Sequence, residues 1–538
     1  MKVEGRLVDI HNRRIFNAEI TVKGGIIGAI EKSDIRTNKI ILPGLIDSHV
    51  HIESSMLTPG NFAMACVPHG TIGVVSDPHE IANVMGIKGV AYMIKESERV
   101  PVKFWFGAPS CVPATRFETN GEKIGPEEVR KLLKKIKIKY LAEMMNFPGV
   151  INGDKEILEK INAAKEAGKK IDGHAPGLSG EGLRKYAEAG ISTDHECSTI
   201  DEAREKIYYG MKILIREGSA ARNIEALEDL YNTDPSELML CSDDLHPEML
   251  QKGHINKLIA RLINEGYDRY DVIRSATLNP VEHYGLEAGL MRVGDIADFI
   301  IVDSLEKMNV LETWISGKKV FGNGRVLFGF NPGDPVNVFN CNPVSVQEIK
   351  IKNLNGKFRI IQAYDGKLLT VEETGGPVSG ENVEPVPGED LLKIVVKDRY
   401  HDAPPAVAFI KGFNLKEGAF ASSVAHDSHN IIAIGTNDDD IVTAINEIVK
   451  LKGGLSVSNA SATDSLKLDV AGIMSSKPCG EVASRYEFLS NRVKSFGCTM
   501  AAPFMTLSFM ALLVIPELKL SDRGLFDGRQ FCHVPLFV

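Results

Sequence analysis

Between residues 44 and 243, eight short apolar stretches alternate with segments of charged, amphipathic pattern. Each apolar stretch has the length of a strand, whereas segments such as 125–137 and 154–168 have the spacing of helices. Eight strand-and-helix units over roughly 250 residues predict a closed (β/α)8 barrel. An open doubly wound sheet is the alternative, but no glycine-rich phosphate loop follows any of the strands. The eight stretches are GLIDSHVH (44–51), TIGVVSD (71–77), VKFWFG (102–107), YLAEMM (140–145), KIDGH (170–174), ISTDH (191–195), MKILIRE (211–217) and LMLCSD (238–243).

The segments on either side of this region have a different pattern. Residues 1–42 contain short strands with a Gly24–Gly25 turn, and short strands return over 286–338. We expect these two flanks to pair into one small β-domain beside the barrel, which would span 43–285. Residues 339–538 would form a C-terminal α+β domain.

The composition narrows the class of protein. Over 538 residues it is 43% hydrophobic and 25% charged, which is ordinary for a globular protein. A net charge of -9 argues against nucleic acid bound through a broad basic surface. Eight cysteines without a CxxC pair, and an N-terminus without a signal-peptide pattern, predict a cytoplasmic protein. The uncharged stretch 498–516 is interrupted by proline and too short to span a membrane, so we expect a buried core helix there.

Polar side chains gather at the C-terminal ends of the predicted strands, where barrel enzymes carry their function. The first strand ends in two histidines one residue apart, which therefore point to the same face. The fourth strand carries a carboxylate in an apolar setting, which is unfavourable unless it has a partner. The set comprises four histidines and two carboxylates: His49, His51, Glu143, His174, His195 and Asp243.

Each of these residues has an ordinary structural explanation when taken alone. A single histidine near a strand end is more often a packed or surface residue, and Asp243 could simply cap the next helix. Six such residues at strand ends that converge are a far rarer coincidence. Imidazole and carboxylate ligands without cysteine suit zinc, manganese or ferrous iron in an open, catalytic site.

Six ligands are more than one tetrahedral ion uses, so we expect two metal ions. Two ions about 3.5–4 Å apart generate a hydroxide at neutral pH. Asp243 could take its proton and pass it to a leaving group, so Asp243 and Glu143 are the expected catalytic residues of a hydrolase. With Glu143 bridging, the expected ligands are His49, His51 and Asp243 for one ion and His174 and His195 for the other.

Further polar residues lie at the same predicted end of the barrel. His79 and Glu80 follow the second strand, and we expect them to contact substrate or relay a proton unless their loop is only a turn. Arg216, at the end of the seventh strand, and Asp244 are also candidate substrate contacts, although Asp244 is equally compatible with an exposed position. Glu196 could orient a metal ligand.

In the C-terminal region, HDSHN (426–430) places His426, Asp427 and His429 close together. An accessory metal site is one interpretation of this spacing. A hydrogen-bonded loop is the favoured one, because such a spacing also arises by chance. On that interpretation, the removal of His426 should change the reaction rate little.

The first 330 residues resemble the amidohydrolase superfamily, in which the flanking strands form a β-sandwich attached to the barrel. Many binuclear members bridge their metals with a carboxylated lysine on the fourth strand. This strand offers Glu143 instead, and Lys139 lies at the wrong end of it. The resemblance rests on PGLIDSHVH (43–51), the histidines at 174 and 195, SD (242–243) and SATLNPVEHYGLEAGLMRVGDIADFIIVD (275–303).

The missing lysine narrows the resemblance to the adenine deaminase family, and it then runs nearly end to end. It implies hydrolysis of adenine to hypoxanthine and ammonia in purine salvage, by attack of a metal-bridged hydroxide at purine C6. It also implies manganese or iron at a binuclear site, so we expect two manganese or ferrous ions per subunit. Apart from the resemblance, we expect a homo-oligomer, with a dimer favoured. The supporting segments are SDPHEIANVMG (76–86), AEMMNFPGV (142–150), DHECS (194–198), SVAHDSHNIIAIGTND (423–438) and PFMTLSFMALLVIPELKLSDRGLFD (503–527).

Two other functions are compatible with parts of this pattern. An amidohydrolase that acts on a cyclic amide or an N-acyl group would share the barrel and the metals. The absence of the strand-four lysine and the match of the C-terminal region weigh against it. A non-catalytic relative would typically lose metal ligands, whereas all six positions are filled here.

Overall fold

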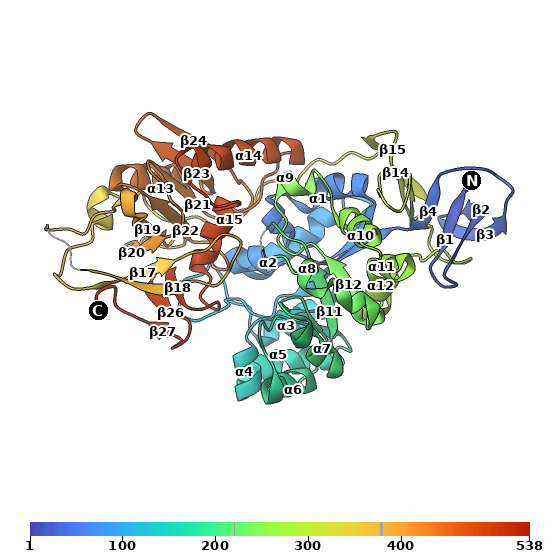
Figure 1. Cartoon of the computed structure of the whole chain (residues 1–538), viewed down its shortest axis with the longest axis horizontal. Coiled ribbons are helices and arrows are strands. Elements are labelled where there is room, and N and C mark those ends of the chain that lie inside the picture. Colours follow the sequence, from blue (N-terminus) through green and yellow to red (C-terminus); the bar gives the residue numbers. More distant parts are fainter. Residues whose placement is uncertain (220, 377–379) are drawn as a thin grey trace.

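The computed structural model describes residues 1–219, 221–376 and 380–538 of the chain. Figure 1 shows three parts along the longest axis of the molecule. A small sheet formed by the two flanks lies at one end, the barrel follows it, and the C-terminal domain lies at the other end.

Eight parallel strands form the barrel, as the apolar stretches predict. Five of them form one sheet in sequence order and three form another. Backbone hydrogen bonds join the two sheets on both sides: the Ser192 amide donates to the Ile171 carbonyl at 2.8 Å, and the Asp243 amide donates to the His49 carbonyl at 2.9 Å. The strands are β5 (Leu45–Val50), β6 (Thr71–Ser76), β7 (Lys103–Ala108), β8 (Ile138–Met144), β9 (Lys170–Gly173), β10 (Thr193–Asp194), β11 (Lys212–Arg216) and β12 (Leu238–Cys241).

Amphipathic helices follow the strands and bury their apolar faces. The predicted helix at 154–168 is α5, which begins after Asp154. The Asp154 side chain accepts hydrogen bonds from the backbone amides of Glu156 and Ile157 at 2.9 and 3.2 Å, as a helix N-cap does. The predicted helix at 125–137 is α3, which ends earlier, at Leu133. The helices are α2 (His79–Ser97), α3 (Pro126–Leu133), α5 (Lys155–Glu166), α6 (Gly180–Glu188), α7 (Ile200–Tyr208) and α10 (Ile255–Asn264).

The two flanks of the barrel form one eight-stranded sheet, with the order β16-β15-β14-β13-β4-β1-β2-β3. It is joined where β13 (Phe299–Val302) pairs antiparallel with β4 (Ile40–Pro43). Gly24 and Gly25, at φ +58° and +82°, make the tight turn that the sequence predicts. Phe299 stacks on Trp314 in a core that also contains apolar residues of the first three strands, so side chains from the two halves meet as in a sandwich. The remaining strands are β1 (Lys2–Asp9), β2 (Arg14–Lys23), β3 (Ile26–Lys32), β14 (Val310–Ile315), β15 (Lys318–Gly322) and β16 (Arg325–Val326).

The C-terminal domain is built on a second eight-stranded sheet, in the order β18-β17-β20-β19-β22-β21-β23-β24. The apolar stretch 498–516 is largely buried as predicted, but only α15 (Pro503–Ser508) is α-helical, and a 3-10 turn continues it to Ala511. Across the described residues, no helix is long and apolar enough to cross a membrane. The strands are β17 (Phe358–Gln362), β18 (Val371–Gly375), β19 (Leu392–Lys397), β20 (Ala406–Lys411), β21 (Ala419–Ser422), β22 (Ile431–Gly435), β23 (Gly454–Asn459) and β24 (Ala462–Lys467), beside α13 (Asp438–Leu451) and α14 (Cys479–Ser495).

The C-terminal domain packs against the barrel next to the ends of its first strands. The Ser475 amide donates to the Met56 carbonyl at 2.8 Å. The Asn61 side-chain amide donates to the carbonyls of Ser476 and Lys477 at 3.0 and 2.8 Å. In Figure 1 the domain accordingly lies beside α1 (Pro59–Cys66) and α2. This contact brings residues from beyond position 365 to the open end of the barrel.

Candidate metal centre

Three of the predicted ligands converge where β5 and β12 end. The Nε2 atoms of His49 and His51 lie 3.2 Å apart. Asp243 Oδ1 lies 3.4 Å from the first and 3.3 Å from the second. Atoms held about 2.1 Å from one ion are separated by roughly 3.0–3.4 Å in octahedral or tetrahedral geometry. The spacing of these three buried side chains therefore suits a single divalent ion.

Glu143, on β8, lies between this group and the other two predicted ligands. Its Oε1 is 3.4 Å from His51 Nε2. Its Oε2 is 2.9 Å from His174 Nδ1 and 3.2 Å from His195 Nε2. Each carboxylate oxygen thus faces a different group of ligands, which is the arrangement that a bridging carboxylate requires.

The backbone of Asp243 is unusual, because its φ of +52° lies in the left-handed region. A non-glycine residue there is strained and persists only where its surroundings hold it. Here two hydrogen bonds hold it to the end of β5. The Asp243 amide donates to the His49 carbonyl at 2.9 Å, and the His51 amide donates to the Asp243 carbonyl at 3.3 Å.

Arg216 lines the same end of the barrel, but its guanidinium is engaged by two carboxylates. Nη1 donates to Asp243 Oδ2 at 2.6 Å and to Glu196 Oε1 at 2.5 Å, and Nη2 donates to Glu196 Oε2 at 2.9 Å. Burial alone would raise the pKa of Asp243. Arg216, together with His49 and His51, instead holds this pKa well below its usual range. The structure therefore favours Arg216 as a positioning residue for Asp243, in addition to the substrate contact that the sequence suggests.

Glu196 lies beside the second group of ligands, as expected for a residue that orients them. Its Oε1 is 3.5 Å from His174 Nδ1 and 3.4 Å from His195 Nε2. Burial alone would lower the pKa of His174, but Glu196 and Glu143 raise it to about 9. Because an imidazole binds a metal only when it is neutral at the binding nitrogen, metal binding here must release a proton.

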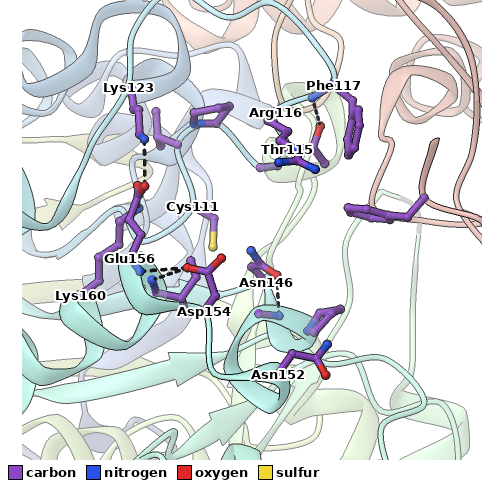
Figure 2. A pocket seen from close by; sticks show the side chains of 17 residues that line it. Cys111, Thr115, Arg116, Phe117, Lys123, Asn146, Asn152, Asp154, Glu156 and Lys160 are labelled. Atoms are coloured by element: carbon purple, nitrogen blue, oxygen red, sulfur yellow. Dashed lines mark hydrogen bonds and ion pairs between the residues drawn. The ribbon is translucent and has the colours of Figure 1, made fainter. Parts of the chain in front are cut away.

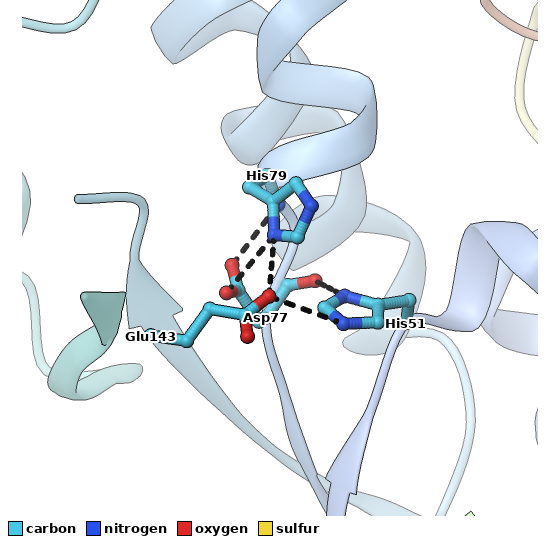
Figure 3. Close-up of side chains that lie close together, drawn as sticks. All are labelled: His51, Asp77, His79 and Glu143. Atoms are coloured by element: carbon cyan, nitrogen blue, oxygen red, sulfur yellow. Dashed lines mark hydrogen bonds and ion pairs between the residues drawn. The ribbon is translucent and has the colours of Figure 1, made fainter. Parts of the chain in front are cut away.

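His79, predicted as a substrate contact, lies against the candidate bridging carboxylate. Figure 3 shows it with His51, Asp77 and Glu143. His79 Nδ1 is 3.4 Å from Glu143 Oε1 and 3.1 Å from Asp77 Oδ2. These four residues form a further group that could hold a cation. Asp77 is not among the site residues expected from the sequence, although its place at the end of the second predicted strand (71–77) is a usable signal.

Glu80 points to the C-terminal domain. Its two carboxylate oxygens accept hydrogen bonds, one from His426 Nδ1 and one from His429 Nε2. The hydrogen-bonded loop expected at 426–430 is present, and its bonds reach a barrel residue. Burial opposes ionisation of Glu80, but the neighbouring histidines hold its pKa well below the usual range. Burial would lower the pKa of His426, whereas Glu80 raises it to about 9.

The metal-ligand groups open into a chamber that both domains line. It encloses about 450 Å3 of empty space, part of it open to solvent. Asp244, half-buried, lies in its wall and accepts a hydrogen bond from Ser54 Oγ. The chamber has the polar metal-ligand groups on one side and apolar side chains on another, which suits a flat ring with polar edges. The C-terminal domain contributes Leu368, His426, Asp427, Phe509, Leu512 and Val514.

A second, wider pocket of about 1270 Å3 lies beside the loop that follows β7 (Figure 2). Its two lysines pair with one glutamate: Lys123 Nζ is 3.0 Å from one Glu156 oxygen, and Lys160 Nζ is 3.8 Å from the other. Asn146 caps the following short helix by accepting from the Gly149 amide at 2.9 Å. These pairings leave the chamber as the better candidate for chemistry.

Known proteins match both parts of the chain. Residues 40–320 match the Amidohydrolase family, and residues 368–532 match the Adenine deaminase C-terminal domain. The chain is 51% identical to "Adenine deaminase" of Salinibacter ruber over all of this chain and 99% of that one. It is 50% identical to that of Methanosarcina mazei, over 100% and 99% of the two chains, and 53% identical to that of Sulfurovum sp., over 99% and 98%. The chain belongs to the adenine deaminase family.

The two family matches cover both walls of the chamber. All six predicted ligands fall within the amidohydrolase match, and the lining residues of the C-terminal domain fall within the adenine deaminase C-terminal match. The amidohydrolase superfamily is metal-dependent, and the described residues of this family member contain several groups able to hold a metal ion.

Proposed function

We propose that this protein hydrolyses adenine and water to hypoxanthine and ammonia. The observation that carries the proposal is the sequence identity of 51% and 50%, over the full length of the chain, to two proteins named adenine deaminase. The relationship includes the C-terminal domain, which closes one side of the chamber. A relationship confined to the barrel would not identify the substrate, because enzymes with many different substrates share that fold.

The residues of the chamber suit this reaction. We propose two manganese or ferrous ions, which when bound would supply a nucleophilic water at neutral pH. Asp243 is placed to accept a proton from the attacking water and to donate it to the departing nitrogen, while Arg216 holds its other oxygen. From the distances between their ligand atoms, the proposed ligands are His49, His51 and Asp243 for one ion, His174 and His195 for the other, and Glu143 for both.

The reaction balances without a further reagent. The oxygen of water bonds to purine C6, and the bond from C6 to the exocyclic nitrogen breaks. That nitrogen keeps its two hydrogens, gains one proton from the water and leaves as ammonia, while the other water proton remains on hypoxanthine. The apolar side chains of Phe509, Leu512 and Val514 line the chamber where a purine ring needs a flat, dry surface.

The test is ammonia release from adenine by protein loaded with manganese, with adenosine, AMP and cytosine measured alongside. Each assay is repeated after exhaustive chelation under anaerobic conditions. We expect metal-dependent turnover of adenine and much slower turnover of the other three. An exposed-histidine variant, His401→Ala, serves as a control and should match the unmodified protein. If metal is bound and no ammonia is released, the proposal fails and cyclic amides become the substrates to test.

A further inference from the structure

One loop of the C-terminal domain, residues 423–430, enters the chamber with polar atoms that lack partners. Asp427 is 3% exposed, and its Oδ2 has no hydrogen-bond partner among the described residues. His79 Nε2 is 4.0 Å from the other Asp427 oxygen, beyond hydrogen-bond distance. A buried carboxylate without partners is unfavourable, so this atom points to a group that a ligand supplies.

The same loop holds Asp427 in a fixed position. His426 precedes it and His429 follows two residues later, and both donate to the Glu80 carboxylate on the barrel. The His426 ring also stacks on Phe509, with the ring centres 5.0 Å apart and the ring planes at 21° to each other. Asp427 is therefore held between two anchored residues, which is how a binding group is kept in position before its ligand arrives.

The apolar wall of the chamber indicates how a ligand would lie. Leu368, Phe509, Leu512 and Val514 line the same space as Asp427. A flat ring that packs against these side chains would present its edge to the carboxylate. A carboxylate accepts hydrogen bonds and does not donate them, so the matching edge of the ring must carry an N–H group.

We propose that Asp427 is a substrate-binding residue that accepts a hydrogen bond from the ring N–H of the five-membered part of the purine. This inference rests on the proposed function, because it takes adenine as the substrate. A free base carries such an N–H, whereas a purine substituted at N9, such as a nucleoside, has lost it there. Asp427 would therefore select free bases over N9-substituted purines, with the discriminating group supplied by the C-terminal domain.

The variants Asp427→Asn and Asp427→Ala test this role, with Asp439→Asn as the matched control. Asp439 is exposed on α13 of the same domain, so the control makes the same change of charge outside the chamber. We measure kcat and KM for adenine, and inhibition by purine and by 9-methylpurine, neither of which carries the amino group. Because a hydrogen bond to a charged group is worth a factor of about ten or more, we expect KM to rise at least about tenfold in both variants. The preference for purine over 9-methylpurine should shrink by a similar factor, with two metal ions per chain retained.

Three results would overturn the inference while leaving adenine deamination intact. The first is an unchanged KM with an unchanged preference between the two inhibitors. The second is loss of a metal ion from the Asp427 variants, which would make Asp427 a ligand together with His79 and Glu80. The third is obtained with the unmodified protein, so it remains decisive even if both variants misfold. It is a crystal structure with bound hypoxanthine in which neither Asp427 oxygen lies within 3.5 Å of a ring nitrogen. Failure of the unmodified protein to release ammonia from adenine would instead refute the proposed function.

Discussion

Replacing Glu80 by glutamine should loosen the contact between the barrel and the C-terminal domain. Glu80 is 2% exposed, and each of its oxygens accepts a hydrogen bond from a different histidine. At neutral pH His426 is charged, with a pKa of about 9, whereas burial lowers the pKa of His429 to about 4 and leaves it neutral. The carboxylate thus has one charged and one neutral donor. An amide could accept from only one of them and would turn its NH2 group toward the other.

The size of the effect follows from these two bonds. A hydrogen bond to a charged group contributes about 1.5–3 kcal/mol, and the change removes one such bond and weakens the other. We therefore expect the free energy of opening of the loop 423–430 to fall by about 3 kcal/mol. At roughly 1.4 kcal/mol per factor of ten, the equilibrium constant for opening of the loop should rise by somewhat more than a hundredfold.

Hydrogen–deuterium exchange of the metal-free protein at pH 7 measures this opening directly. Peptides that cover 423–430 should exchange about a hundredfold faster in Glu80→Gln, whereas peptides from α5 on the barrel should not change. The variant Glu481→Gln, at an exposed position of the same domain, is the control. Exchange of the loop at an unchanged rate would refute the reasoning, because it would mean that the Glu80 contacts do not hold the loop.

Three further changes have expected outcomes. Glu143→Gln should leave fewer than two metal ions per chain by elemental analysis, because an amide cannot offer an anionic oxygen to each group of ligands; full metal content would contradict its bridging role. Asp243→Asn should keep more metal than Glu143→Gln does, and its kcat should fall by about a hundredfold or more. Near-normal ammonia release by this variant would contradict the role of Asp243 in proton transfer. Glu80 raises the pKa of His426 to about 9, so the stability from this residue is fully present below about pH 6.5 and is lost as the pH rises through about 9. The difference in thermal unfolding midpoint between the unmodified protein and His426→Gln should therefore shrink between pH 6.5 and pH 10, and a constant difference would contradict this account.

The barrel and the metal-ligand groups were predictable because their signals are local. Each strand is a short apolar run, and a barrel brings the C-terminal ends of all its strands to one side. His49, Glu143 and Asp243 could therefore be placed together without knowledge of the packing between them. The spacing found between their ligand atoms agrees with that placement.

Contacts between distant side chains could not be predicted in this way. Arg216 ends one strand and reaches carboxylates at the ends of two others, and only the rotamers in the folded barrel decide which atoms meet. The contact of Glu80 with His426 joins residues 346 positions apart. It depends on how the C-terminal domain packs against the barrel, for which neither segment carries a local pattern.

The central claim is a two-metal site that deaminates adenine, and one titration tests it most directly. Metal-free protein is titrated with manganese under anaerobic conditions while ammonia release from saturating adenine is measured. The account predicts that activity rises to a plateau at two manganese ions per chain, and that Glu143→Gln reaches no comparable plateau. Full activity at one ion per chain, or full activity in the chelated protein, would contradict it.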